Sequence, residues 1–320
     1  MINIILYKEL ILILDKNNYK YIIDNKHSKE CIAVGIGDIL FKLLNLQENL
    51  VEKPIYINLD LFQNGKFKLN DNSESKVWFD EPFNNFCFRI DLLNDIIKHS
   101  IFFEKKDFIF IITDYNAALI SKTNINFNFK QIKNLNLLLH NDFYKFTFNK
   151  KLTNFIKNPY IIFHTKLRLN HSYDYKKIKN ELDRFFSGLK IHNFNIILLG
   201  ERHFKPTEES KIQGITTIYQ ELLKLNNYNS SKILDLTKDE IYNKLNYYNY
   251  KKDLCLIKNA KWNICIGQGG QLCSSLAFGK TIFLDPIDHE VFYDNKNLFN
   301  SGHIYYKNLL PFCNFLIQKL

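Results

Sequence analysis

The stretch Asn263–Asp285 constrains the fold of this chain more than any other part of its sequence. An apolar run, Ile264–Ile266, leads into a turn that holds three glycines, Gly267–Gly270, and small and apolar residues follow over Leu272–Phe278. A Gly-Lys pair then interrupts the pattern before a second apolar run, Thr281–Leu284. This order is typical of a strand, a glycine turn, a helix and a second strand. It predicts a parallel βαβ step, and so a fold of the α/β class.

The glycine turn is a candidate anion site. Its backbone N–H groups can approach a ligand closely because glycine has no Cβ. The helix that follows points its positive end at the same place, which favours an anion and above all a phosphate. A tight turn without a ligand is the alternative, since glycine is common between strands and helices. The candidate binding residues are Gly267, Gln268, Gly269, Gly270, Gln271 and Ser274.

The rest of the chain shows further strand and helix patterns. Strands are expected over 2–6, 10–14, 19–23, 54–59, 108–113, 160–164, 194–199 and 231–236. Helices are expected over 40–46, 91–99, 175–189, 215–225, 252–260 and 306–319, with 86–90 only a short apolar piece. Each half begins as strand, loop, helix and strand, and 320 residues exceed one ordinary core. The sequence therefore predicts two α/β domains.

Composition and charge exclude several classes of protein. No apolar run approaches the roughly 20 residues of a membrane span, and Lys8, Glu9 and Asp15 interrupt the apolar N-terminus, so no signal peptide is expected. The six cysteines show no CxxC pair, which is typical of free thiols in a reducing compartment. The net charge of +10 comes from scattered lysines without a nucleic-acid-binding motif. We expect a cytoplasmic protein with no specific nucleic-acid partner, and leave contact with a membrane surface open.

A second glycine junction lies near the N-terminus, where Gly35 and Gly37 precede Asp38 and the expected helix 40–46. A carboxylate there would lie at the carboxyl edge of a parallel sheet, where such sheets bind ligands. Asp38 could then accept a proton from an attacking hydroxyl. Taken alone, the position favours an Asp that caps the helix.

Cations follow the strand expected over 160–164. Thr165, Lys166 and Arg168 suit phosphate oxygens, and an arginine can bind them through two hydrogen bonds. A solvated basic loop is the equal alternative. His164 ends the strand and is expected to be a packed, hydrogen-bonded residue and not a catalyst.

A charged triplet follows the next strand and Gly200. Arg202 could neutralise a diphosphate while Glu201 receives sugar hydroxyls, although the triplet could equally be a solvent-facing turn. The acidic loop after Leu284 is typical of loops after strands, so no metal site is expected. The absence of a G-x-S-x-G pattern argues against a hydrolase nucleophile.

The order of these motifs resembles the GT-B glycosyltransferases, and within them the heptosyltransferase-type family of lipopolysaccharide core synthesis. The motifs are G-I-G-D-I-L, a strand followed by Thr-Lys, a strand ending in L-L-G-E-R, D-L-T-x-x-E, and the glycine turn with S-x-A-x-G-K-T. The resemblance covers most of residues 31–285. It implies two Rossmann-like domains with parallel sheets facing a cleft. The acceptor-side domain would cover 1–155, the nucleotide-sugar domain 156–305, and a helix over 306–320 would pack back.

The resemblance also implies roles for particular residues. Asp38 would be the base that activates an acceptor hydroxyl on a glycan or glycolipid, with Gly35 and Gly37 beside it. Thr165 and Lys166 would contact the phosphates of a nucleotide-sugar donor, and Gln268–Ala277 would hold the donor, without a metal or other cofactor. The mechanism would be inverting. Gln268 stands where the family has Asp, and Ser275 near where it has His.

Other readings stay open at this point. A polysaccharide pyruvyl transferase or a sugar-nucleotide epimerase would share the GT-B-like frame. A binding or scaffold protein that kept the frame and lost the chemistry is the non-enzymatic alternative, and Gln268 favours it modestly.

Overall fold

The structure of the chain is a computed structural model. It describes residues 4–23, 53–58, 66–68, 74–76, 82–98, 104–113, 148, 150–164, 180, 195–199, 232–236, 247–266, 274–276, 278–284, 303–306, 311, 314 and 318. Contacts between residues divide the chain into two compact units, one of residues 1–135 with 245–250 and one of 136–244 with 251–320. The domain boundaries expected at 155 and 305 stay predictions, as does the packing of the last helix.

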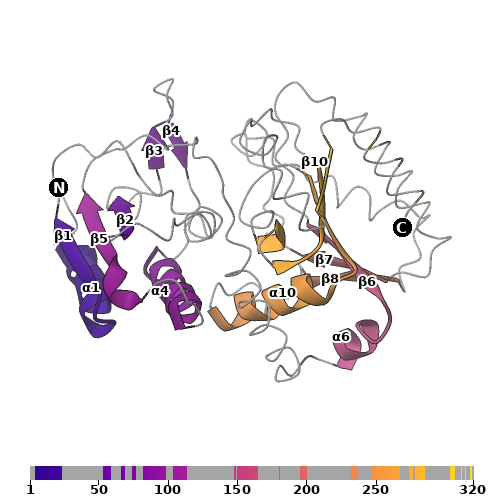
Figure 1. The fold of residues 1–320 in the computed structure, drawn as a ribbon, viewed down its shortest axis with the longest axis horizontal. Coiled ribbons are helices and arrows are strands. Elements are labelled where there is room, and N and C mark those ends of the chain that lie inside the picture. The colour runs from indigo at the N-terminus through magenta and orange to yellow at the C-terminus, as the bar shows by residue number, and fades with distance from the viewer. Residues whose placement is uncertain are drawn as a thin grey trace. The chain divides into compact units, whose positions relative to one another are not determined.

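The first unit contains a three-stranded parallel sheet (Figure 1). Its central strand is β5 (Phe108–Thr113), and β1 (Lys20–Ile23) and β2 (Lys53–Asn58) pair with it on either side. Phe110 of β5 lies between Tyr21 and Ile55 in the register. These three strands confirm the runs expected over 19–23, 54–59 and 108–113.

The first helix, α1 (Ile4–Lys16), occupies residues where the sequence predicts two short strands over 2–6 and 10–14, and that prediction is wrong. A strand would place Leu10, Leu12 and Leu14 on one face, because its side chains alternate. In the structure Leu10 and Leu14 are buried whereas Leu12 is 66% exposed. This is the helical spacing of i and i+4, so burial follows the period of a helix despite the run of branched residues.

The end of α1 is fixed by a Schellman motif. Asn18 adopts a left-handed conformation with φ of 56°. Its N–H donates to the carbonyl of Asp15 at 2.9 Å, and the N–H of Tyr19 donates to the carbonyl of Leu14 at 3.0 Å. These two bonds satisfy carbonyl groups that a helix end leaves without intrahelical partners.

The long helix α4 (Pro82–Lys98) includes the residues 86–90 that were expected as a separate apolar piece, so the helix expected over 91–99 begins much earlier. Proline suits the first helical position because its missing N–H would have no partner there. Ile90, Leu92 and Leu93 are buried and give the helix its apolar face.

Tyr19 joins α1, α4 and β5. Its hydroxyl donates to Asn94 Oδ1 at 2.7 Å, and the amide of Asn94 donates in turn to Asn17 Oδ1 at 2.9 Å. Its ring packs edge-on against Phe110, with ring centroids 5.0 Å apart. Burial raises the pKa of the Tyr19 hydroxyl, which therefore stays protonated and able to donate.

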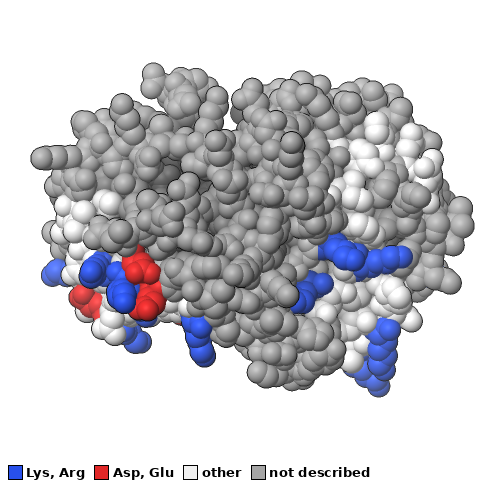
Figure 2. All heavy atoms as spheres, viewed as in Figure 1, with Lys and Arg blue, Asp and Glu red and all other residues white. Residues whose placement is uncertain are grey.

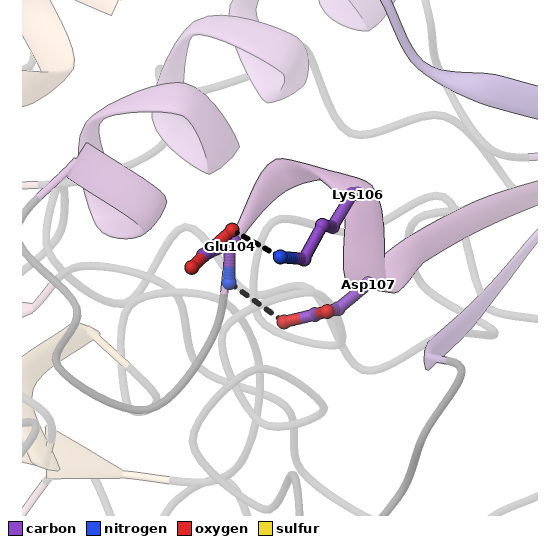
Figure 3. Close-up of polar contacts among 3 residues, drawn as sticks. All are labelled: Glu104, Lys106 and Asp107. Atoms are coloured by element: carbon purple, nitrogen blue, oxygen red, sulfur yellow. Dashed lines mark hydrogen bonds and ion pairs between the residues drawn. The ribbon is translucent and has the colours of Figure 1, made fainter.

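Two smaller features also belong to this unit. β3 (Lys66–Lys68) and β4 (Glu74–Lys76) form an antiparallel pair. A short 3-10 turn, η1 (Lys105–Asp107), leads into β5, and the N–H of Glu104 donates to Asp107 Oδ2 at 2.7 Å (Figure 3). Lys106 and Glu104 form an ion pair of 2.8 Å, but both side chains are 71% exposed, so the pair contributes little stability.

The described part of the second unit contains a sheet of six strands in which all neighbouring strands are parallel. The order across the sheet is β11-β10-β9-β6-β7-β8. The strands are β6 (Tyr160–His164), β7 (Asn195–Leu199), β8 (Ile233–Asp235), β9 (Trp262–Ile266), β10 (Thr281–Leu284) and β11 (Ile304–Tyr306). The sequence predicted the first five of these strands, and the mixed α/β fold with parallel sheets is confirmed.

The central strands are buried on both faces. Every residue of β6 and β10 is buried, as expected for continuous apolar runs in a parallel sheet. α10 (Tyr247–Asn259) lies against the sheet, where its Leu256 carbonyl accepts a hydrogen bond of 3.0 Å from the Tyr160 hydroxyl. This helix is longer than the one expected over 252–260. A further short helix, α6 (Lys150–Phe155), precedes β6.

The edge strand β11 was not predicted. Tyr306 was expected to begin the last helix, but it pairs with Leu284 as the end of β11. Residues 311, 314 and 318 are helical. The helices expected over 175–189 and 215–225 lie outside the described residues, apart from Asn180, which is helical.

The left-handed residue Asn18 gives a first test of this fold. Asn18→Val is expected to lower the free energy of unfolding by about 1–2 kcal/mol, because a branched Cβ is strained in this conformation. Asn18→Gly relieves that strain and is expected to change the free energy by less than about 1 kcal/mol. Urea unfolding followed by circular dichroism measures both. Equal losses in the two variants would contradict the Schellman assignment.

Candidate functional site

The carboxyl ends of β6 and β9 lie at the centre of the candidate site. The two strands pair in parallel, with Ile161 beside Trp262 and Phe163 beside Ile264. From β6 the sheet continues through β7 and β8 to one edge, and from β9 it continues through β10 and β11 to the other. The strand order therefore reverses between β6 and β9. Open α/β sheets bind ligands at such a switch point, outside the carboxyl ends of the strands.

Three predicted ligand-binding segments begin at this edge of the sheet. They follow three neighbouring strands, β7, β6 and β9, which end at Leu199, His164 and Ile266. Because these strands are neighbours and parallel, the residues from which the three segments begin lie side by side. The segments lie outside the described residues, so the roles of their side chains stay predictions. They comprise Glu201 and Arg202 after β7, Thr165, Lys166 and Arg168 after β6, and Gly267, Gln268, Gly269, Gly270 and Gln271 after β9.

Of the predicted site residues, Ser274 lies within the described part of the chain, in the helical residues 274–276. Its side chain is buried, with 2% exposed. Gly35, Gly37 and Asp38 of the first unit lie outside the described residues. Their assignment as the acceptor side stays a prediction.

A short hydrogen bond crosses the switch point. Ser275 Oγ lies 2.6 Å from His164 Nε2, and both side chains are buried. Burial lowers the pKa of His164 to about 3, although a hydrogen bond with Asn263 opposes this shift. The imidazole is therefore neutral at physiological pH. The expectation that His164 is a packed, hydrogen-bonded residue is confirmed.

The Ser275 hydroxyl also reaches β9. It forms a hydrogen bond with the thiol of Cys265, whose pKa is raised to about 12 by burial. His164 and Cys265 lie next to each other on paired strands, as the register of Phe163 with Ile264 requires. One hydroxyl thus bridges the ends of the two strands at the switch point.

This group of Ser, His and Cys is not a nucleophilic centre. A catalytic thiol needs a lowered pKa, and that of Cys265 is raised. A catalytic serine needs access to substrate, and Ser275 is fully buried. The three residues instead form a buried polar cluster beneath the ligand edge, that is, the edge of the sheet at the carboxyl ends of β7, β6 and β9.

Asn263 and Gly279 hold the βαβ step together from the other end. The amide of Asn263 donates to the carbonyl of Ile257 at 2.8 Å and to that of Lys280 at 3.2 Å. A Cβ on Gly279 would collide with this amide and would lie 2.7 Å from the Ile257 carbonyl oxygen. Gly279 is therefore required by close packing. In the sequence, Gly279 indicates only the end of the helical pattern. Its position shortly before a buried strand is the feature that could have indicated close packing.

A second buried histidine links the helical residues to the edge of the sheet. His303 Nδ1 accepts a hydrogen bond of 3.2 Å from the N–H of Thr281. Burial lowers the pKa of His303 to about 4, while a hydrogen bond to the backbone of Leu276 opposes the shift. His303 directly precedes β11, and its neutral ring contacts the backbone of Thr281 in β10 and of Leu276 in the helical residues 274–276. No local sequence pattern predicts this contact.

On the face drawn in Figure 2, the described surface of the second unit shows mostly uncharged residues with several basic side chains among them, and no acidic side chain of the described residues is visible there. The exposed Lys157, Lys261 and Lys280 stand shortly before β6, β9 and β10. They therefore lie towards the amino edge of the sheet, opposite the switch point. The predicted phosphate-binding residues Lys166, Arg168 and Arg202 lie outside the described residues.

In the part of the chain that the structure describes, no helix is both long and apolar enough to cross a membrane.

No protein-family model matches the chain, and no curated protein matches its sequence. Solved structures resemble it in part. An α,α-trehalose-phosphate synthase (UDP-forming) from Burkholderia vietnamiensis is 10% identical, with a TM-score of 0.37 over 63% of this chain and 42% of that one. The α,α-trehalose 6-phosphate synthase from Burkholderia multivorans is 10% identical, with a TM-score of 0.34 over 56% and 39%.

A third structure is the N-terminal domain of trehalose-6-phosphate phosphatase from Candida albicans. It is 12% identical, with a TM-score of 0.29 over 64% of this chain and 46% of that one. The chain thus spans less than half the length of each of these three proteins.

The packing of Gly279 predicts a specific sensitivity. Gly279→Ala is expected to lower the free energy of unfolding of the second unit by about 2 kcal/mol or more, because the backbone of Ile257 must move. Lys280→Ala, at the exposed neighbouring position, is the control and is expected to cost no more than about 0.5 kcal/mol. Trp262 fluorescence in a Trp78→Phe background reports the unfolding in urea. Equal effects of the two variants would refute the close contact.

His303 predicts acid sensitivity. Its folded pKa lies below the ordinary value of 6.5, so between about pH 6.5 and 4 the unfolded chain binds the proton and the folded chain does not. Stability therefore falls as the pH falls, by about 2 kcal/mol from pH 7 to pH 5 for this residue. His303→Asn keeps a hydrogen-bond acceptor and is expected to remove that part of the loss. Urea unfolding at both pH values measures it, and an unchanged loss in the variant would count against the assignment.

Proposed function

We propose that this chain is a GT-B-like glycosyltransferase that moves a sugar from a nucleotide-diphosphate sugar to a hydroxyl of a glycan or glycolipid. The observation that carries the proposal is the strand order of the second unit. The switch point between β6 and β9 falls where the sequence places the Thr-Lys segment and the glycine turn. A sheet of this order binds nucleotide phosphates at that point.

The donor phosphates would be bound by cations and backbone N–H groups. Lys166, Arg168 and Arg202 would pair with the phosphate oxygens, and the N–H groups of Gly269 and Gly270 would donate to them. These groups stabilise the charge that develops on the diphosphate as the bond to the sugar breaks. Because they supply the compensating charge, the proposed transfer requires no metal ion.

Asp38 is proposed as the general base. It would take the proton of the acceptor hydroxyl while that oxygen forms a bond to the anomeric carbon of the sugar and the diphosphate leaves. Attack on the face opposite the leaving group inverts the anomeric configuration. The positions that match the family motif support this role, and the heptosyltransferase type is the finer assignment that they favour.

A second candidate is a binding protein that holds the nucleotide sugar without transferring it. Gln268 favours this reading, because the family pattern has an acidic residue at that position. Gln268 cannot accept a proton or carry a negative charge. Binding would then persist while turnover is lost.

Nucleotide binding and turnover distinguish these readings. Thermal-shift and calorimetric titrations with UDP-, GDP-, ADP- and CMP-sugars are expected to show binding of one nucleoside diphosphate class. Release of the nucleotide in the presence of a glycolipid fraction then reports transfer. Binding without release supports the second candidate. The absence of binding to every nucleotide, together with salt-sensitive binding to DNA, would overturn both.

If transfer is observed, Asp38→Asn is expected to lower kcat by about 10²–10⁴, as the loss of a general base does. Its affinity for the donor should stay within about twofold of the wild-type value, since Asp38 acts on the acceptor. Lys157→Ala, at the amino edge of the sheet, serves as the control and should leave both quantities unchanged. Full activity of Asp38→Asn would exclude the proposed base.

A further inference from the structure

The buried hydroxyl of Ser275 occupies a particular place in the second unit. It bonds to His164 on β6 and to Cys265 on β9, so it bridges the two strands between which the strand order reverses. Both of these strands belong to the described core, and each directly precedes one of the two predicted anion-binding segments. One hydroxyl therefore holds both sides of the ligand edge.

We propose that His164 and Ser275 are positioning residues, whose hydrogen bond holds the segments after β6 and β9 at the spacing that a diphosphate requires. This inference rests on the proposed function, since it assigns the diphosphate as the ligand. His164 directly precedes Thr165, and Ser275 follows Gln271 by four residues in the sequence. A change at either residue is thus passed to a ligand-binding segment over a few covalent bonds.

Burial makes the bond rigid and keeps it away from the substrate. His164 is 2% exposed and Ser275 is 0% exposed, so neither side chain touches a ligand at the surface. A hydrogen bond in such surroundings is strong because no water competes for it. The helical backbone after Ser275 is also fixed, since the N–H of Gly279 donates to the Ser275 carbonyl at 2.9 Å.

The same strand offers a matched control at its other end. Tyr160 begins β6, and its hydroxyl donates to the Leu256 carbonyl at 3.0 Å in a buried position. Tyr160→Phe removes one buried hydrogen bond from β6 without approaching the switch point. A merely structural role for His164 and Ser275 would make their loss resemble this variant.

The experiment measures affinity for inorganic pyrophosphate and for UDP, GDP and ADP by calorimetry, with stability measured in parallel. Ser275→Ala and His164→Leu are expected to weaken binding by about ten- to hundredfold, the effect of displacing one hydrogen bond to a charged ligand. His164→Gln is expected to restore affinity to within about threefold of wild type, because its amide can reach the position of Nε2. Tyr160→Phe is expected to bind as wild type.

Each outcome decides the inference. If folded Ser275→Ala binds as wild type, or if Tyr160→Phe loses as much affinity, the inference is overturned while the proposed function stands. If Ser275→Ala does not fold, the comparison of His164→Gln with His164→Leu decides, and equal affinities overturn the inference. If the wild-type protein binds neither pyrophosphate nor any nucleoside diphosphate, the proposed function and this inference both fail.

Discussion

The pairing of β6 with β9 is the interaction on which the second unit depends. It joins strands that are about 100 residues apart in sequence. On one side of the pair the sheet continues through β7 and β8, and on the other side it continues through β10 and β11, with all strands parallel. Without this pair the sheet would be two separate three-stranded pieces, neither with enough neighbours to bury its strands on both faces. The buried cluster joins His164 of β6 and Cys265 of β9 to the helical residue Ser275. The same strand pair therefore supports both the core and the carboxyl ends where ligand binding is predicted.

The local parts of the fold could be predicted because burial leaves a direct record in the sequence. Runs such as 160–164 and 281–284 are apolar throughout and are bounded by polar residues or glycine, which is typical of buried parallel strands. α1 was mistaken for strands because its Ile and Leu residues favour both structures, and only the exposure of Leu12 reveals the helical period. β11 was missed because a run of three residues is too short to identify without its partner β10.

The arrangement of the candidate site, in contrast, could not be predicted from local sequence patterns. Motif order identified the strands whose ends would carry ligand-binding residues, but not the order of those strands in the sheet, which depends on pairing between distant segments. The bond between His164 and Ser275 joins residues 111 positions apart, and no local pattern encodes it. The contact of Gly279 with Asn263 and Ile257 likewise arises only when α10 packs on the sheet. Residue types allowed candidate ligand-binding residues to be predicted, whereas the buried contacts beneath them could be found only from the fold.

Among the described strands of the first unit β1 lies at the edge of the sheet, and this position has a consequence for synthesis of the chain on the ribosome. β1 ends at Ile23, and the strand that it pairs with, β5, begins at Phe108. At about 5–20 residues per second, the ribosome needs several seconds or more to make β5 after β1 has been made. Ile22 and Ile23 are exposed even in the folded unit, so for that whole time the nascent strand carries exposed apolar side chains and backbone groups that β5 cannot yet pair. Production of this protein should therefore depend on chaperones that protect early segments until translation has supplied their partners.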